Sequence, residues 1–162
     1  MENNFHIAEV NGLGADRLAG LFGQCVAVDR WARELVDGRP YAGLDELLTR
    51  ADELSAGLTD DEVEHALGDH PRIGERTAPD TMSAAEQSGV DATALADRLL
   101  AANLAYEQRF GHIYLVCASG RSGEELLADL AERMRNDPVT ELSVVRRELG
   151  KIARLRLERM VT

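Results

Sequence analysis

Cysteine is scarce in this sequence, and no apolar run approaches the roughly 20 residues that a membrane-spanning helix needs. The two cysteines, Cys25 and Cys117, lie far apart and match no metal-binding or redox spacing. His65 and His70 are five positions apart, off the i, i+4 spacing that would place both on one helix face. We therefore expect no metal site, no disulfide framework and no insertion into a membrane.

Positive charge is in the minority, because 18 lysine and arginine residues face 29 aspartate and glutamate residues, giving a formal net charge of −11. This excess repels phosphate backbones, so no nucleic-acid partner is expected. The first residues lack the basic start and apolar stretch of a secretory signal, and the few cysteines suit a reducing compartment. The sequence thus predicts a cytoplasmic protein.

A helical repeat of apolar residues runs through most of the 162 residues. This length corresponds to about one domain, which can bury about 70% of its unfolded surface. The predicted fold is all-α, a single compact domain over residues 1–162 with about eight helices and one short extended segment. The expected helices cover residues 15–26, 29–36, 44–56, 59–68, 83–89, 91–110, 122–135 and 138–161.

Several of these helices begin with recognisable capping residues. Thr59 with Glu62, and Ser122 with Glu125, have the spacing of a capping box, in which hydroxyl and carboxylate satisfy each other's orphan backbone N–H groups. Asp137 is expected to cap the last helix.

One apolar segment, residues 112–118, does not follow the helical repeat. It is rich in β-branched and aromatic residues and is bounded by Gly111 and Gly120, which is typical of extended backbone. No second strand is apparent to pair with it. Because backbone N–H and C=O groups need partners, an extended stretch in a helical protein can offer them to a ligand.

Residues 69–82 contain two prolines and a glycine and show no helical repeat, which predicts a loop of about 14 residues. Within it, His70 precedes Pro71, which holds the histidine away from helical backbone angles. Histidine has an unperturbed pKa of about 6.5, which suits proton transfer in both directions near neutral pH. On spacing alone, the favoured interpretation is a polar loop residue that caps the preceding helix.

Ser83 and Glu86 open the next expected helix and have capping-box spacing, which is a sufficient structural explanation. A helix N-terminus after an irregular loop also presents free N–H groups and a positive dipole end. A planar, urea-like or anionic ligand could be bound there by Ser83, Glu86 and Gln87. The residues alone leave both interpretations open.

Several motifs follow one another along the chain. They are residues 70–75 (His-Pro-Arg-Ile-Gly-Glu), 83–87 (Ser-x-x-Glu-Gln), 109–111 (Arg-Phe-Gly) leading into 116–118 (Val-Cys-Ala), 136–138 (Asn-Asp-Pro) and 151–157 in the last helix. Together they resemble the 2-oxo-4-hydroxy-4-carboxy-5-ureidoimidazoline (OHCU) decarboxylases of urate breakdown. The resemblance covers almost the whole chain, and motifs in the correct order are more specific than any single one.

The resemblance implies a cofactor-free decarboxylase that converts the small-molecule substrate OHCU to (S)-allantoin. It assigns catalytic roles to His70, as the acid/base, and to Glu86. It also implies an all-α fold and a homodimer. The implied substrate-binding residues are Pro71, Ser83, Ala84, Ala85, Glu86, Gln87, Tyr114, Leu115, Val116, Cys117 and Ala118.

Two other functions fit parts of the same sequence. A non-catalytic helical interaction module would account for the acidic charge and for a purely capping role of Ser83 and Glu86. A related enzyme that acts on another ureido or imidazole acid would keep the same scaffold. Sensitivity to replacement of His70 distinguishes the decarboxylase from the first, and a panel of substrates distinguishes it from the second.

Overall fold

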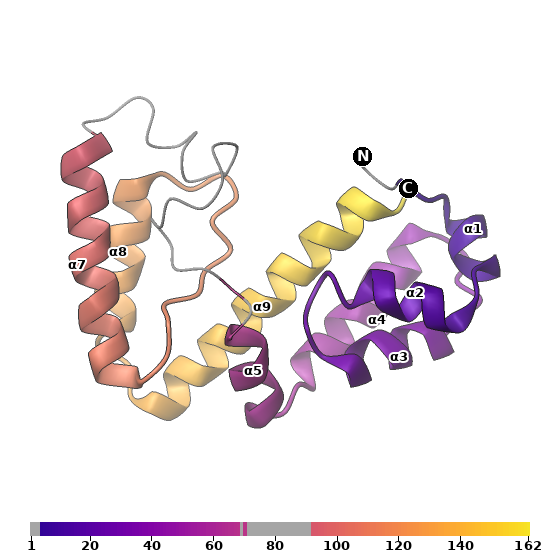
Figure 1. Cartoon of the computed structure of the whole chain (residues 1–162), viewed down its shortest axis with the longest axis horizontal. Coiled ribbons are helices and arrows are strands. Elements are labelled where there is room, and N and C mark those ends of the chain that lie inside the picture. Colours follow the sequence, from indigo (N-terminus) through magenta and orange to yellow (C-terminus); the bar gives the residue numbers. More distant parts are fainter. Residues whose placement is uncertain (1–3, 69, 71–91) are drawn as a thin grey trace. The chain divides into compact units, whose positions relative to one another are not determined.

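The computed structural model describes residues 4–68, 70 and 92–162, and Figure 1 labels its helices. In this part of the chain, the only β-interaction is an isolated parallel bridge between Phe5 and Val161. The all-α fold expected from the sequence is therefore confirmed. The helices of the described residues are α1 (Ile7–Gly12), α2 (Ala15–Phe22), α3 (Asp29–Asp37), α4 (Leu44–Ala56), α5 (Asp60–Leu67), α7 (Ala92–Phe110), α8 (Gly123–Arg133) and α9 (Pro138–Met160).

Near the N-terminus, the helices depart from the sequence expectation. The sequence pattern does not predict α1, because a helix of six residues with a single buried side chain, Val10, is too short to show a 3.6-residue repeat. The helix expected over residues 15–26 ends at Phe22. The N–H groups of Gly23 and Cys25 bond back to the preceding turn and close the helix there.

The chain divides into two compact units. The first unit combines Met1–Ala66 with Arg146–Thr162, and the second is Leu67–Val145. Each unit contains its own set of packed helices and its own buried apolar side chains.

The core of the first unit is built around Trp31, whose side chain on α3 is fully buried where α3 packs against α2 and α4. The indole Nε1 donates a hydrogen bond to Oγ of Ser55 on α4, 3.0 Å away. Gly150 of α9 lies against the same serine, and a Cβ atom at this position would lie 3.1 Å from Ser55 Cβ. The close approach of α9 to α4 therefore depends on the absence of a side chain at position 150.

Arginines connect α9 to other elements of the first unit. Arg146 donates from Nε to the carbonyl oxygen of Leu58 at 2.8 Å and forms an ion pair with Asp60. Arg154 pairs with Asp52 on α4. Because these pairs are largely exposed, each is worth only about 0–1 kcal/mol, and the apolar core supplies most of the stability.

The turn that follows α3 is closed by buried polar contacts. Nη1 of Arg39 donates to the carbonyl oxygen of Leu13 at 2.6 Å, and the hydroxyl of Tyr41 donates to the carbonyl oxygen of Leu35. The side-chain amide of Asn11 also pairs with the backbone of Tyr41 in both directions, at 2.9 and 2.8 Å. Burial raises the pKa of Tyr41 to about 12.

In the second unit, α7 and α8 lie side by side (Figure 1) and share a second apolar core. Residues 113–118 adopt neither helix nor strand and contribute Tyr114 and Val116 to this core. Burial raises the pKa values of both Tyr106 and Tyr114 well above the usual value for a phenol. The buried members of the core are Leu95, Leu99, Tyr106, Tyr114, Val116, Leu126 and Leu130.

Two features are absent from the described residues. Across 4–68, 70 and 92–162, no helix combines the length and apolar character that a bilayer crossing requires. The same residues contain no cluster of three or more histidine, cysteine, aspartate or glutamate side chains arranged to hold a metal ion.

Replacing Trp31 with phenylalanine is expected to lower the free energy of unfolding by about 2–4 kcal/mol, because it removes the bond to Ser55 and leaves part of a buried site empty. A urea titration followed by circular dichroism measures the change. Leu100→Ala, at a side chain that is 48% exposed, is the control and should change the same quantity by less than about 1 kcal/mol. Equal effects of the two variants would contradict the assignment of Trp31 to the core.

The three tyrosines predict how stability falls at high pH. A phenol in the unfolded chain has a pKa of about 10. Burial raises the pKa of Tyr41 to about 12 and also raises the pKa values of Tyr106 and Tyr114. Folding therefore favours the neutral phenol. This contribution is fully present below pH 10 and is lost as the pH rises toward 12. Phenolate absorbance should therefore appear together with loss of the helical circular dichroism signal. Phenolate formation with a midpoint near pH 10 in a fully folded protein would contradict the coupling of tyrosine ionisation to unfolding.

Candidate active site

The predicted site residues fall into two groups. His70 and residues 114–118 are described by the structure, and all of them belong to the second compact unit. The other group lies outside the described residues, as do the helix expected over residues 83–89 and the rest of the loop expected over 69–82. This group comprises Pro71, Ser83, Ala84, Ala85, Glu86 and Gln87.

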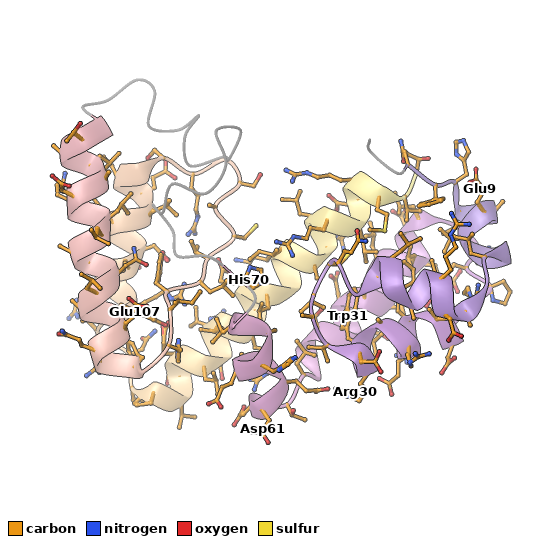
Figure 2. All side chains as sticks on the ribbon, viewed as in Figure 1. Glu9, Arg30, Trp31, Asp61, His70 and Glu107 are labelled. Atoms are coloured by element: carbon orange, nitrogen blue, oxygen red, sulfur yellow. The ribbon has the colours of Figure 1, made fainter. Side chains whose placement is uncertain are left out.

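His70 follows the end of α5 (Figure 2). Its backbone N–H donates to the carbonyl oxygen of Leu67, the last residue of the helix, at 3.2 Å. This bond fixes the backbone of His70 at the helix terminus, and the residue is half-buried. A backbone anchored in this way restricts the region that the imidazole can reach.

Of residues 112–118, which the sequence predicts to be extended, residues 113–118 adopt neither helix nor strand, and His112 lies in a bend after α7. Residues 114–116 are at most 3% exposed, whereas residues 117–118 are half-buried. Left-handed glycines bound the segment, with φ of 79° at Gly111 and 77° at Gly120. Within the described chain, no backbone–backbone hydrogen bond reaches residues 114–116. Among the described residues, side chains supply the contacts to residues 114–116.

Helix α8 supplies those contacts. The hydroxyl of Tyr114 donates a hydrogen bond to Asp129. Nη1 of Arg133 donates to the carbonyl oxygen of Leu115 at 2.6 Å, and the same guanidinium lies 4.7 Å from the centroid of the Tyr114 ring. Burial, and then the Asp129 carboxylate, raise the pKa of Tyr114, so its phenol is protonated at neutral pH and acts as the donor.

Arg133 is itself paired with Glu141 in the first turn of α9. The side chains are only 5% and 0% exposed, respectively. Nε of Arg133 lies 2.6 Å from Oε1 and 3.1 Å from Oε2 of the carboxylate. Burial alone would lower the pKa of Arg133, but the Glu141 carboxylate raises it above its usual value. The guanidinium is therefore charged and directs Nη1 toward the extended segment.

Arg121 closes the other end of the segment. Its backbone N–H donates to the carbonyl oxygen of Ala118 at 3.0 Å. Its guanidinium Nη1 lies 3.7 Å from Oδ1 of Asp129, and Nη1 of Arg133 lies 3.6 Å from Oδ2 of the same carboxylate. Asp129 thus compensates the charges of Arg121 and Arg133 and accepts the hydrogen bond from the Tyr114 hydroxyl.

The sequence patterns do not single out Arg133, yet a signal for it exists. Arg133 follows Leu126 by seven positions and Leu130 by three, and both leucines are buried on the same face of α8. Glu141 similarly precedes the buried Val145 of α9 by four positions. A charged residue in an apolar stripe requires a buried partner of opposite charge. The sequence could therefore have predicted Arg133 and Glu141 as a buried ion pair.

Comparison with known proteins places this chain in a family. The sequence pattern of the OHCU decarboxylases matches residues 11–158. The 2-oxo-4-hydroxy-4-carboxy-5-ureidoimidazoline decarboxylase of Amia calva is 30% identical over 165 aligned residues, covering 94% of this chain and 93% of that protein. The uric acid degradation bifunctional protein TTL of Arabidopsis thaliana is 31% identical over 145 residues, or 84% of this chain. This chain spans only 45% of the Arabidopsis protein.

Solved structures agree with the sequence matches. A crystal structure of OHCU decarboxylase in the presence of (S)-allantoin has a TM-score of 0.72 and 28% identity, covering 86% of this chain and 95% of its own. A crystal structure of (S)-allantoin synthase has the same TM-score of 0.72 at 16% identity, covering 96% of this chain and 54% of its own, a likeness of fold alone. The resemblance seen in the sequence motifs is thereby confirmed, and this chain belongs to the OHCU decarboxylase family.

Proposed function

We propose that this chain decarboxylates OHCU to (S)-allantoin, as a carboxy-lyase of urate degradation. The observation that carries the proposal is the family match over residues 11–158. The Amia calva relative named for this decarboxylation supports it, since the alignment covers 93% of that protein. We infer that residues 1–162 act as one OHCU decarboxylase-like domain in the cytoplasm.

The substrate carries its own electron acceptor, so the reaction needs no cofactor. Its carboxylate lies on a ring carbon next to a C=N bond. When the bond to the carboxylate breaks, CO₂ leaves, the electron pair forms a ring C=C bond, and the imine nitrogen takes up a proton. The ring carbon that bears the ureido group then accepts a proton, while the neighbouring hydroxyl loses its own and becomes a carbonyl. The protein has to orient, desolvate and protonate the substrate on one face.

In this mechanism His70 transfers the proton, either by taking it from the hydroxyl or by delivering it to the ring carbon. Delivery to one face sets the S configuration. Glu86 and Gln87 bind the ureido and ring N–H groups, alongside Pro71 and the other members of residues 83–87. The anchored, half-buried position of His70 after α5 supports its role as acid/base.

The extended segment can bind the departing carboxylate without forming an ion pair with it. A tight ion pair with this carboxylate would stabilise the ground state more than the transition state, in which the charge has moved to the ring. The segment contains apolar side chains and backbone groups, and two arginines of the described residues that lie close to it are paired with other groups. Arg133 donates to Glu141 and to the Leu115 carbonyl, and Arg121 forms an ion pair with Asp129.

Replacing His70 with alanine is expected to slow the formation of optically active allantoin by about 10²–10⁴-fold, the usual contribution of a positioned proton transfer. OHCU is generated in situ from urate with urate oxidase and hydroxyisourate hydrolase. Circular dichroism then follows the appearance of one-handed product against the spontaneous, racemic background.

His65→Ala is the matched control, because His65 is an exposed histidine on α5 only five positions earlier. It should retain the activity of the parent protein, and both variants should retain the helical spectrum. Parent-like turnover by the His70 variant would contradict the acid/base role. Slow racemic product that the parent protein does not accelerate would contradict the decarboxylase function itself.

We further expect the active protein to be a homodimer, as the family resemblance implies. Light scattering on the purified chain should then give a mass about twice the 17.7 kDa of one chain. A single-chain mass at the concentration of the activity assay would contradict the dimer and leave the proposed reaction intact.

A further inference from the structure

One charged side chain binds the backbone of the extended segment at Leu115. Nη1 of Arg133 donates to the carbonyl oxygen of Leu115 at 2.6 Å, and its guanidinium packs 4.7 Å from the Tyr114 ring centroid. One side chain therefore contacts two successive residues of the segment. Among the described residues, no backbone–backbone hydrogen bond reaches residues 114–116, and Arg133 supplies the bond to the Leu115 carbonyl.

Glu141 in turn orients the guanidinium. Both carboxylate oxygens accept from Nε of Arg133, at 2.6 and 3.1 Å, and the Glu141 side chain is 0% exposed. A guanidinium is a planar, rigid fork, so a fixed Nε also fixes the direction of Nη1. The position of the Leu115 carbonyl is thereby determined through Arg133 from the first turn of α9.

Stability alone does not account for this pair. Apolar side chains of similar volume often fill such a space at a lower desolvation cost than two buried charges. In the described part of the chain, Nη2 of Arg133 is buried without a hydrogen-bond partner, which adds to that cost. A charged pair that is expensive to bury, and that directs a hydrogen bond at a single carbonyl, is better explained by what it positions.

We propose that Arg133, oriented by Glu141, is a positioning residue that holds the backbone of residues 114–118 in the conformation that binds substrate. The inference rests on the proposed function, because it takes this segment as a wall of the OHCU pocket. Arg133 acts through the segment and does not contact the substrate. Its loss should therefore weaken substrate binding and leave proton transfer at His70 largely unchanged.

Arg133→Lys tests this inference, because lysine keeps the positive charge but lacks the fork that reaches Glu141 and Leu115 together. For OHCU generated in situ, KM is expected to rise about tenfold while kcat changes by less than about threefold. A merely structural role would lower the folded fraction and hence the apparent kcat, with KM unchanged. Far-UV circular dichroism reports the folded fraction.

Cys117 provides a second readout that does not depend on catalysis. It lies on the segment and is half-buried, whereas Cys25 is 1% exposed in the first unit. Labelling with a thiol reagent, located by peptide mass mapping, should be about tenfold faster at Cys117 in Arg133→Lys and unchanged at Cys25. If the parent protein does not convert OHCU, the proposed function fails, and the labelling rates still decide whether Arg133 holds the segment.

Arg98→Lys is the matched control. Arg98 belongs to the same unit, its side chain is 59% exposed, and it pairs with Glu124 on α8. This variant should leave both KM and the Cys117 labelling rate unchanged. If Arg133→Lys does not fold, Glu141→Gln takes its place, since it keeps an acceptor oxygen for Nε and should change both readouts in the same direction by a smaller factor. Unchanged KM and unchanged Cys117 labelling in a folded variant, or a fall in kcat alone, would overturn the proposal.

Discussion

The Arg133–Glu141 pair carries two opposite charges into the core of the second compact unit, and the surrounding structure depends on their compensation. Removing one partner of such a pair leaves an isolated buried charge, which typically costs about 3–5 kcal/mol. The pair connects the end of α8 to the first turn of α9 and extends to Leu115. The same interaction therefore closes part of the core and sets the backbone that we propose as the pocket wall.

Local structure could be predicted from the sequence where it depends on residues close together in the chain. Thr59 and Glu62 form the expected reciprocal capping bonds, at 2.9 and 3.1 Å, and Oγ of Ser122 accepts from the Glu125 N–H at 3.1 Å. The extended backbone at residues 113–118 is also as expected. Capping boxes and helical stripes involve residues three or four positions apart, so a short stretch of sequence contains all the interacting residues.

The candidate site could be predicted only in part, because its geometry depends on contacts between distant positions. Arg133 and Leu115 are 18 positions apart, and no local pattern connects a helical arginine to a carbonyl in an irregular segment. His70 is the opposite case. Its spacing favours a structural role, and the proton-transfer role that we propose rests on the family resemblance. Motifs carry chemistry that periodicity does not, whereas buried polar contacts such as those of Asp129 emerge only from the folded chain.

The two left-handed glycines, Gly111 and Gly120, set where the extended segment enters and leaves the core. Successive side chains of extended backbone point in opposite directions. One residue inserted between Gly111 and Leu115 would bring a different carbonyl to Arg133 and change the direction of the side chains near it. Replacement of a side chain at constant length leaves this register unchanged, whereas an insertion or a deletion alters it.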